Sequence, residues 1–491
     1  MRDKPGVWSR QAWFPVVAGA AICALVALAV AVILPSGGES APPEPARAAA
    51  SAGAAASAPP VPTPAGTATP LTAPGYSPLK PVIPGSFADP MILKDGDVYY
   101  AYGTNNGAAA LPVATAPAPT GPWTVSPGDG LARLPSWAVS GWTWAPEVVP
   151  PLRKGDPYLL YFSARAREGN VQCVGVATAV SPAGPFTPRD GAPLICPRNL
   201  GGAIDPASHI EADGARYLVY KSDARKTAAI YLVRMAPDGL ATAGPAKRLL
   251  GRDADEPVLV EAPDLVRRGD RYVLFYSAGW YFQPNYQTRY ATATSIAGPY
   301  TKAGEPLQST GGYGGKITGP GSADLFGGGD GDQLVFHGIV KRHGGSKVDR
   351  AMYVAALGWD GSRPVLRGVP VRYEAERGRN NGCVGTLKRP KASGDGAVGP
   401  FDRDGCRYEL PVFAPAAGRY EIRTGYANRS GGASLLELSV NGKAAASVPM
   451  RPTRGDDWAS TTASADLVAG WNTLGLRRLE GRGQVDYLEL R

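Results

Sequence analysis

A pattern in which a small or acidic residue precedes a proline recurs along this chain at almost constant intervals. Each copy continues into a short apolar run, a turn containing Asp or Gly, and a second run rich in aromatic and β-branched residues, such as DVYYAYG or RYVLFYS. The copies align on five prolines that are 56, 60, 57 and 57 residues apart, namely Pro90, Pro146, Pro206, Pro263 and Pro320. Such regular spacing indicates an internal repeat, so the chain should fold as an array of similar units.

The strand content of each unit predicts a five-bladed β-propeller. The first half of a copy contains two strands, and a further strand, a Pro/Gly turn and an aromatic residue follow in three copies, beginning at Ala114, Ala177 and Ala291. Four strands per repeat and five repeats are typical of a propeller. The first strand of each blade lines the central channel, so acids in these strands, namely Asp89, Asp205 and Glu261, should converge near the axis.

Composition divides the 491-residue chain into four segments. Residues 1–34 are basic at the start and then uncharged from Ala12 to Leu34, which at about 1.5 Å per residue is long enough for a helix to cross a ~30 Å hydrocarbon layer. We expect a signal anchor or a cleaved signal peptide. Residues 35–78 form a Pro/Ala-rich linker. The propeller should occupy residues 79–370, and a β-sandwich residues 371–491.

Either interpretation of the N-terminal segment predicts an extracytoplasmic bacterial protein, which is membrane-anchored if the segment is retained and secreted if it is cleaved. Export makes four of the cysteines interpretable, because disulfides form in oxidising compartments. We expect two local disulfides, Cys173 with Cys196 and Cys383 with Cys406. The alternative is four buried thiols.

Charge and composition exclude several classes of function. The net charge is +9, but the basic residues are scattered among acids, so we expect no nucleic-acid partner and at most an attraction to acidic polymers. Three histidines are too few for a histidine-rich metal site. The chain has no P-loop, no G-x-S-x-G motif and no dinucleotide-binding motif, and we expect no organic cofactor. Carboxylates remain as the candidate catalytic groups.

Three carboxylates near one channel mouth suit the hydrolysis of a glycosidic bond. The reaction needs one protonated acid for the leaving oxygen and one ionised base for the water, with space between them. A third carboxylate nearby raises the pKa of the acid, because like charges disfavour ionisation. Any one of these acids alone could instead cap a turn or bind a neighbouring blade, but three in corresponding copies favour the catalytic interpretation.

The motifs ADP, WAPE, IDP with YLVYKSD, and VEAP with LFYSAGW, taken in this order, resemble family 43 of the glycoside hydrolases. The resemblance covers about residues 79–370 and implies a five-bladed propeller that hydrolyses glycosides with inversion. It implies that Asp89 is the general base, that Asp205 orients the acid and tunes its pKa, and that Glu261 is the general acid. It also implies that Trp144 lines the sugar pocket, and we interpret Glu147 as structural.

The last repeat departs from the family pattern. Many members carry a histidine there that reaches an axial ion or water, whereas this chain has Ser322 in the corresponding stretch. His337 follows in the motif VFHG. Whether His337 compensates, and whether the propeller holds an axial ion, stays open at the level of the sequence.

The C-terminal segment alternates polar and apolar residues between Gly and Asn turns, which predicts a β-sandwich of the jelly-roll type. Its opening YEAERG and closing VDYLELR resemble carbohydrate-binding modules of the family 6 and 35 type. The resemblance implies a structural calcium held by Glu374, Glu376 and Asp486, which carry the hard oxygen donors that calcium prefers. Tyr426 and Trp458 are candidates for its sugar-binding aromatics.

The sequence therefore predicts an all-β, inverting glycoside hydrolase that acts on arabinose- or xylose-containing plant polysaccharides or oligosaccharides, with α-L-arabinofuranosidase as the first choice. A β-xylosidase or an exo-galactanase of the same fold is the alternative among enzymes. A non-catalytic surface propeller that binds carbohydrate is the alternative outside them. We expect the protein to act as a monomer.

Overall fold

The computed structural model describes residues 77–224, 227–328, 331–394 and 396–491 of the chain. The predicted signal or anchor segment and all but the end of the linker lie outside these ranges. Within them, no helix is both long and apolar enough to cross a membrane.

The propeller consists of five antiparallel four-stranded sheets, which confirms the predicted number of repeats. Hairpin turns join the strands, as at Gly96, whose positive φ of 57° suits the tight DG turn between the first two strands. A short 3-10 helix, η1 (Arg198–Leu200), precedes the third blade. The strands are β1 (Met91–Asp95), β2 (Val98–Tyr102), β3 (Val113–Ala116) and β4 (Thr124–Val125); β5 (Ala138–Val149), β6 (Tyr158–Ala166), β7 (Gln172–Ala179) and β8 (Thr187–Pro188); β9 (Ala203–Ile210), β10 (Arg216–Ser222), β11 (Ala229–Arg234) and β12 (Lys247–Gly251); β13 (Val260–Arg268), β14 (Arg271–Ala278), β15 (Gln287–Ala293) and β16 (Thr301–Lys302); β17 (Thr318–Gly328), β18 (Gly331–Gly344), β19 (Lys347–Asp360) and β20 (Arg363–Leu366).

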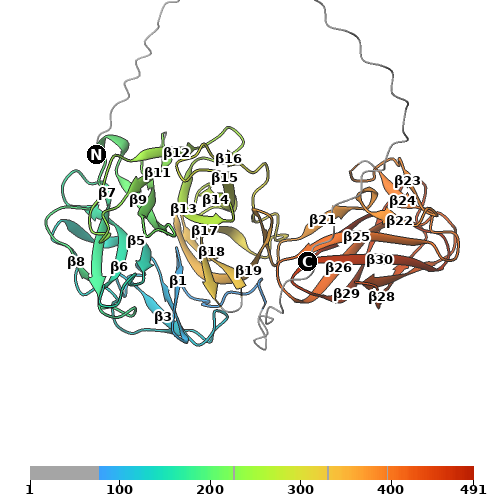
Figure 1. Ribbon diagram of the computed structural model, residues 1–491, viewed down its shortest axis with the longest axis horizontal. Helices are drawn as coiled ribbons and strands as arrows, with labels where there is room; N and C mark the ends of the chain where they lie inside the picture. The colour runs from blue at the N-terminus through green and yellow to red at the C-terminus, as the bar shows by residue number, and fades with distance from the viewer. Residues whose placement is uncertain (1–76, 225–226, 329–330, 395) are drawn as a thin grey trace, which may run out of the picture. The chain divides into compact units, whose positions relative to one another are not determined.

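The five inner strands form a closed ring around the axis (Figure 1). β1 contacts β5, β5 contacts β9, β9 contacts β13, β13 contacts β17, and β17 returns to β1. The hydrophobic core is divided accordingly, because each of five buried clusters lies between two neighbouring blades. Every blade therefore buries both faces, and its middle strands are almost continuously apolar, as in Tyr158–Ala166 and Arg271–Ala278.

The ring closes where the segment before β1 meets the last blade. The backbone N–H groups of Val82 and Ile83 donate to the carbonyl oxygen of Met352 in β19, and the N–H of Met352 donates to the carbonyl of Ile83. The N–H of Phe87 donates to the carbonyl of Arg350 at 2.8 Å. The beginning of the propeller is thus fixed by backbone hydrogen bonds to its final blade.

One backbone position repeats in all five blades with a left-handed conformation. Non-glycine residues with φ between 44° and 54° stand at this position, which lies just before β1 in the first blade and within the inner strand in the other four: Asp89, Ala145, Asp205, Ala262 and Ser322. Such a conformation costs a side chain about 1–2 kcal/mol, so its presence in every blade marks a constraint of the fold. The register of the inner strand is interrupted close to this residue in blades 2 to 5.

This position corrects two details of the sequence alignment. The structural equivalent of the repeat proline in the fifth blade is Ala323, not Pro320, because Ser322 is the left-handed residue there. Asp89 and Asp205 are equivalent, but Glu261 is one residue earlier than its blade's left-handed residue, Ala262. The alignment on prolines placed the fifth copy wrongly, because Pro320 lies before the left-handed residue Ser322, whereas the repeat proline of the other blades directly follows that residue.

The C-terminal segment is a β-sandwich of two antiparallel sheets. One sheet has the order β23-β24-β31-β26-β29, with β21 paired to β31, and the other has the order β22-β25-β30-β27-β28. A single apolar cluster fills the space between them. Besides η2 (Ala375–Arg377), its elements are β21 (Val371–Glu374), β22 (Arg379–Asn380), β23 (Gly385–Leu387), β24 (Ala397–Gly399), β25 (Arg407–Ala414), β26 (Gly418–Ala427), β27 (Ser434–Val440), β28 (Lys443–Met450), β29 (Ala459–Leu467), β30 (Gly470–Glu480) and β31 (Gln484–Leu490).

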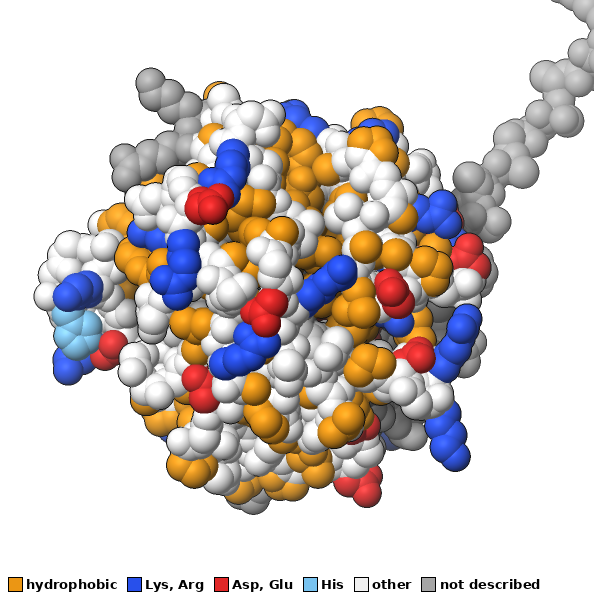
Figure 2. All heavy atoms as spheres, turned by 90° about the vertical axis from the view of Figure 1, so that its left-hand side faces the viewer, with side chains coloured by type: hydrophobic (Ala, Val, Ile, Leu, Met, Phe, Trp, Pro, Cys, Tyr) orange, Lys and Arg blue, Asp and Glu red, His pale blue; other side chains and the backbone are white. Residues whose placement is uncertain are grey.

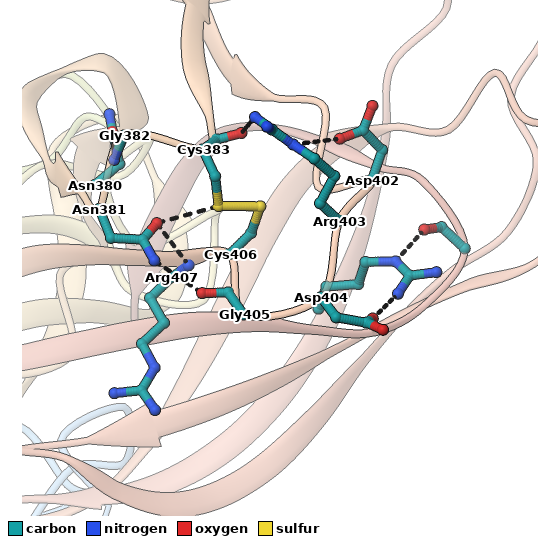
Figure 3. Close-up of a disulfide and its surroundings, with 12 residues drawn as sticks. Asn380, Asn381, Gly382, Cys383, Asp402, Arg403, Asp404, Gly405, Cys406 and Arg407 are labelled. Atoms are coloured by element: carbon teal, nitrogen blue, oxygen red, sulfur yellow. Dashed lines mark hydrogen bonds and ion pairs between the residues drawn. A yellow bond between two sulfur atoms is a disulfide. The ribbon is translucent and has the colours of Figure 1, made fainter.

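Both predicted disulfides are present, Cys173 with Cys196 and Cys383 with Cys406. The second one joins two loops of the sandwich (Figure 3). Beside it, the Asn381 amide donates to the carbonyl of Gly405 at 2.8 Å and accepts the N–H of Arg407 at 3.2 Å. The disulfide and this amide therefore tie the same two loops together.

Charges on the propeller surface are mixed in sign. Figure 2 shows the face around β7 and β8, where Lys and Arg side chains alternate with Asp and Glu and do not gather into one basic patch. This face offers no continuous stripe of positive charge of the kind that tracks a nucleic-acid backbone.

Candidate active site

A pocket of about 330 Å³ lies at the mouth of the propeller channel. It brings together all four residues predicted for the active site, Asp89, Asp205, Glu261 and Trp144. The left-handed backbone explains how adjacent residues reach one cavity, because Ile204 with Asp205, and Glu261 with Ala262, both contribute to its wall. The rest of the lining includes Thr104, Lys221, Asp223, Trp280, Tyr281, Tyr286, Ser322 and Arg350.

Asp89 is held as an ionised carboxylate. Its Oδ1 accepts a hydrogen bond from Arg350 Nη1 at 2.7 Å, and its Oδ2 accepts one from Thr104 Oγ1 at 2.5 Å. Burial alone would raise the pKa of Asp89, but the Arg350 charge, together with His337 and Thr104, outweighs burial and holds the pKa well below its usual range. The carboxylate is therefore charged and fixed in orientation.

His337 stands behind this carboxylate. Its Nδ1 lies 3.2 Å from both the backbone nitrogen and Oδ1 of Asp89, and its ring stacks on Tyr286 with centroids 5.6 Å apart. Burial and the nearby Arg350 charge lower the pKa of His337 to about 4, so the ring is neutral near pH 7. Ser322, at the left-handed position of blade 5, lines both this pocket and a narrow axial cavity, and its backbone N–H donates to Ser277 Oγ.

Asp205 in β9 and Glu261 in β13 also line the pocket. Asp205 Oδ2 accepts the backbone N–H of Ala262 at 2.9 Å, which sets the side chain beside its neighbour. Burial, and then the charge of Glu261, raise the pKa of Asp205 to about 8. Lys221 Nζ lies 3.2 Å from Glu261 Oε2 and 3.0 Å from Asp223 Oδ1. At neutral pH Asp205 therefore retains its proton, while Asp89 is ionised.

A second set of three acids lies on the inner strands β5, β13 and β17, in each case two residues after the left-handed position. Glu147, Asp264 and Asp324 line a narrow axial cavity of about 40 Å³. Glu147 Oε1 accepts the N–H and hydroxyl of Ser208 in the next blade, and Asp264 Oδ2 accepts the N–H of Leu325. Burial raises the pKa of Glu147 to about 8 and that of Asp264 to about 7, and it raises that of Asp324 well above its usual value.

Two charged partners in the pocket were missed at the level of the sequence. Lys221 is 3% exposed and lies within the quoted motif YLVYKSD, where a lysine between apolar residues of a buried strand is itself a signal. Arg350 lies 261 residues after Asp89, and nothing near either residue in the chain connects them. Thr104 was also missed, although its hydroxyl joins Asp89 to the N–H of Ala145 at the start of the next blade's inner strand.

The predicted calcium ligands of the sandwich lie near one another. Ser393 Oγ contacts Glu374 Oε2 at 2.7 Å and Asp486 Oδ1 at 3.0 Å. Burial raises the pKa of Asp486 to about 6, and the Glu374 charge adds to this rise. Gly394 passes so close that a side chain there would meet Glu374 and Glu376. Within the described ranges, however, no group of three or more His, Cys, Asp or Glu residues is arranged to hold a metal ion.

The two aromatic candidates of the sandwich differ in exposure. Tyr426 is a core residue, 3% exposed, and its hydroxyl accepts the backbone N–H of Arg451. The prediction that Tyr426 contacts sugar is therefore wrong, because its position in β26 directs the ring into the sandwich. Trp458 is half-buried, and its indole N–H donates to the carbonyl of Pro390.

A five-bladed propeller with a carboxylate pocket at the channel mouth, followed by a β-sandwich, is the architecture of a carbohydrate-active protein. Comparison with known proteins gives the same result. Residues 78–362 match the model of glycosyl hydrolases family 43, and residues 371–491 match that of carbohydrate binding module family 35. The chain belongs to glycosyl hydrolase family 43, a family of inverting glycosidases, and carries a C-terminal family 35 module.

Individual relatives are more distant. The chain is 30% identical over 234 residues to an arabinoxylan arabinofuranohydrolase of Bacillus subtilis, covering 43% of this chain and 41% of the relative. It is 27% identical over 244 residues to an extracellular endo-α-(1→5)-L-arabinanase of Thermotoga petrophila, covering 43% and 50%. The chain thus spans about half the length of these relatives. The crystal structure of a thermostable family-43 glycoside hydrolase is similar with a TM-score of 0.51 and 26% identity, covering 58% of this chain and 93% of that one.

Proposed function

We propose that the protein removes terminal α-L-arabinofuranosyl residues from plant polysaccharides or oligosaccharides by inverting hydrolysis. The observation that carries this proposal is the meeting of Asp89, Asp205 and Glu261 in one pocket, with Asp89 ionised and Asp205 protonated at neutral pH. These are the two protonation states that glycoside hydrolysis needs on opposite sides of the scissile bond.

Each residue has a distinct task in this proposal. Asp89, fixed by Arg350 and Thr104, orients a water molecule and accepts its proton as the bond to the sugar breaks. Glu261 donates a proton to the leaving oxygen. Asp205 retains a proton near neutral pH, and Lys221 stabilises the charge that Glu261 acquires when it has donated.

Two observations support a terminal pentose as the sugar in the pocket. A volume of about 330 Å³ lies at the small end of the roughly 300–1,000 Å³ typical of ligand pockets, which favours one sugar residue over a bound segment of polymer. Both named relatives act on arabinose-containing glycans by their names. A β-xylosidase remains the nearest alternative, because a xylose residue has the same number of heavy atoms.

The experiment is a panel of nitrophenyl glycosides, α-L-arabinofuranoside, β-D-xyloside and β-D-galactoside, with the anomer of the first-formed product read by proton NMR before mutarotation. We expect the arabinofuranoside to be cleaved fastest and the product to have inverted configuration. Preference for the xyloside would replace arabinofuranosidase by β-xylosidase. A retained anomer would remove Asp89 from the role of base, since a retaining enzyme uses a carboxylate nucleophile.

The C-terminal module would hold the enzyme on its polymeric substrate, with Glu374, Glu376 and Asp486 as ligands of a structural calcium. The close approach of these acids around Ser393 and Gly394 supports this, since a divalent cation would relieve their mutual repulsion. When bound, the ion would cross-link the first and last strands of the module. Addition of calcium after chelation should raise the melting temperature of the protein, and an unchanged melting temperature would contradict the site.

Two disulfides favour an extracytoplasmic location, as does the extracellular location in the name of the Thermotoga petrophila relative. The choice between anchored and secreted forms depends on the N-terminal segment, which lies outside the described residues.

A further inference from the structure

Strand β5 carries two tryptophans that are two residues apart and differ in exposure. Trp144 lines the pocket, whereas Trp142 is 38% exposed. Their rings lie side by side, with centroids 5.5 Å apart and planes tilted by 55°. Trp142 therefore extends the aromatic wall of the pocket outward to solvent.

Arg165, on the neighbouring strand β6, supports this exposed ring. Its guanidinium carbon lies 3.4 Å from the centroid of Trp142, so the two planes are in stacking contact. Within the described ranges Arg165 has no carboxylate partner and no hydrogen bond, and its Nε is buried and unpaired. A half-buried arginine without an acid is unusual, because burial of a charge normally requires a partner.

A second polar side chain without a partner lies next to Arg165. Gln172 in β7 is the direct cross-strand neighbour of Arg165, so the two side chains project from the same face of the blade. Gln172 is only 2% exposed, yet neither its amide nitrogen nor its amide oxygen has a hydrogen-bond partner. Buried polar groups are normally paired, and here Arg165 Nε and both amide atoms of Gln172 are buried without a partner.

The backbone that carries both tryptophans is tied to the candidate catalytic residues. Asn105 donates from its backbone and from its side chain to the carbonyl of Thr143, which lies between the two tryptophans. The N–H of Ala145 donates to Thr104 Oγ1, and that hydroxyl donates to Asp89. A ligand on Trp142 would thus be held at a fixed position relative to Asp89.

We propose that Trp142 and Arg165 form a subsite for the leaving group, which holds the sugar ring to which the cleaved residue is attached. The inference rests on the proposed function and deepens it. The C–H face of the sugar would pack on the exposed side of the indole, while the Arg165 guanidinium supports the ring from its other face. A ring and a few convergent polar groups are the usual elements of such a site.

Comparison of two substrates with different leaving groups tests the subsite. Methyl α-L-arabinofuranoside has a leaving group too small to reach Trp142, whereas an arabinose-bearing oligosaccharide places a sugar ring there. Both need protonation of an unactivated oxygen, so the chemical step is matched. In Trp142→Ala we expect kcat/KM to fall about tenfold on the oligosaccharide, which is about 1.4 kcal/mol, and to change less than about twofold on the methyl glycoside.

Arg165→Gln is the second variant, because it keeps a polar side chain in place and removes the stacked charge. It should raise KM for the oligosaccharide and leave the methyl glycoside unaffected. Trp471→Ala is the matched control, since Trp471 is equally exposed at 37% but lies in the β-sandwich. Equal losses on both substrates in Trp142→Ala would overturn the subsite and assign the residue a structural role.

The failure of the proposed function gives a different result. If the panel identifies another sugar, the methyl glycoside and oligosaccharide of that sugar replace those above. We then expect the same result for Trp142→Ala, a loss of about tenfold on the oligosaccharide and of less than about twofold on the methyl glycoside. If no glycoside is cleaved, calorimetry of oligosaccharide binding to wild type and Trp142→Ala decides the question. A weaker affinity in the variant supports the subsite, and equal affinities overturn it.

Discussion

The propeller contains two groups of three acids that come from inner strands of different blades, sharing only β13, and that differ in their partners. The pocket group, Asp89, Asp205 and Glu261, is accompanied by Arg350 and Lys221 within ion-pair distance. The axial group comprises Glu147, Asp264 and Asp324. Within the described residues none of its members has an ion pair, and their contacts are with backbone N–H groups and a hydroxyl.

The comparison teaches that the partner, and not the acid, determines the charge. Both groups are buried, and burial raises the pKa of each acid in the axial group and of Asp205. Asp89, which has an arginine at 2.7 Å, has its pKa lowered instead. The axial acids accept hydrogen bonds that connect one blade to the next, whereas in the pocket Asp89 is ionised and Asp205 is protonated at neutral pH.

The largest expected effect comes from replacing one carboxyl by an amide in each group, Asp89 in the pocket group and Glu147 in the axial group. Asp89→Asn removes the ionised base, so kcat should fall by about 10²- to 10⁴-fold. Glu147→Gln replaces a carboxyl that is already mostly neutral at pH 7 with an isosteric amide that still accepts the Ser208 bonds, so kcat/KM should stay within about threefold of wild type. Circular dichroism of both variants controls for folding.

Similar losses of activity in these two variants would break the comparison, because the axial group would then take part in the reaction. A fully active Asp89→Asn would remove Asp89 from the chemistry.

An intermediate effect concerns the charge of Lys221. Its positive charge lowers the pKa of Asp205 against the effects of burial and Glu261, so Lys221→Met should allow Asp205 to keep its proton to higher pH. The alkaline limb of the kcat/KM profile should move upward by about one to three pH units. A pH profile with an unchanged alkaline limb, at whatever lower rate, would show that Lys221 does not control this proton.

The smallest effect is on stability. The pKa of Asp264 is raised to about 7 in the fold, whereas an aspartate in an unfolded chain has a pKa of about 3.9. Between these values the unfolded chain releases a proton that the folded chain retains, so stability falls as the pH rises through this window. Asp264→Asn does not titrate, and its melting temperature relative to wild type should rise by a few degrees from about pH 4 to pH 8. A relative melting temperature that falls over this range would show that Asp264 is ionised in the fold.

Much of the propeller could be predicted from the sequence, because the sequence repeats. Four strands per repeat and five repeats predicted the five sheets, and the motifs brought Asp89, Asp205, Glu261 and Trp144 into one pocket. The errors have a common cause, because the irregular turn at each inner strand changes the register by a residue or more, as at Glu261 and Ala323. Spacing between prolines does not record such a shift.

The charged partners of these acids were harder to predict from the sequence. Arg350 reaches Asp89 only because the ring closes the last blade against the first, a contact between residues 261 positions apart. Lys221 is local to its motif, but its role depends on the fold of the next blade, which supplies Glu261. The prediction for Tyr426 failed for a different reason. In an alternating strand, the register alone determines whether an aromatic side chain points inward or outward.

The first and fifth blades meet at a seam where the ring closes, and the candidate base lies at this seam. Asp89 belongs to the first blade, while Arg350 and His337 belong to the fifth, and the segment from Val82 to Phe87 is stitched to Met352 and Arg350 by backbone hydrogen bonds. If the seam parts, Asp89 loses the arginine that keeps it ionised, even while the other four joints between blades stay packed. Catalysis would then be lost before the propeller unfolds, so enzymatic activity would report whether the ring is closed.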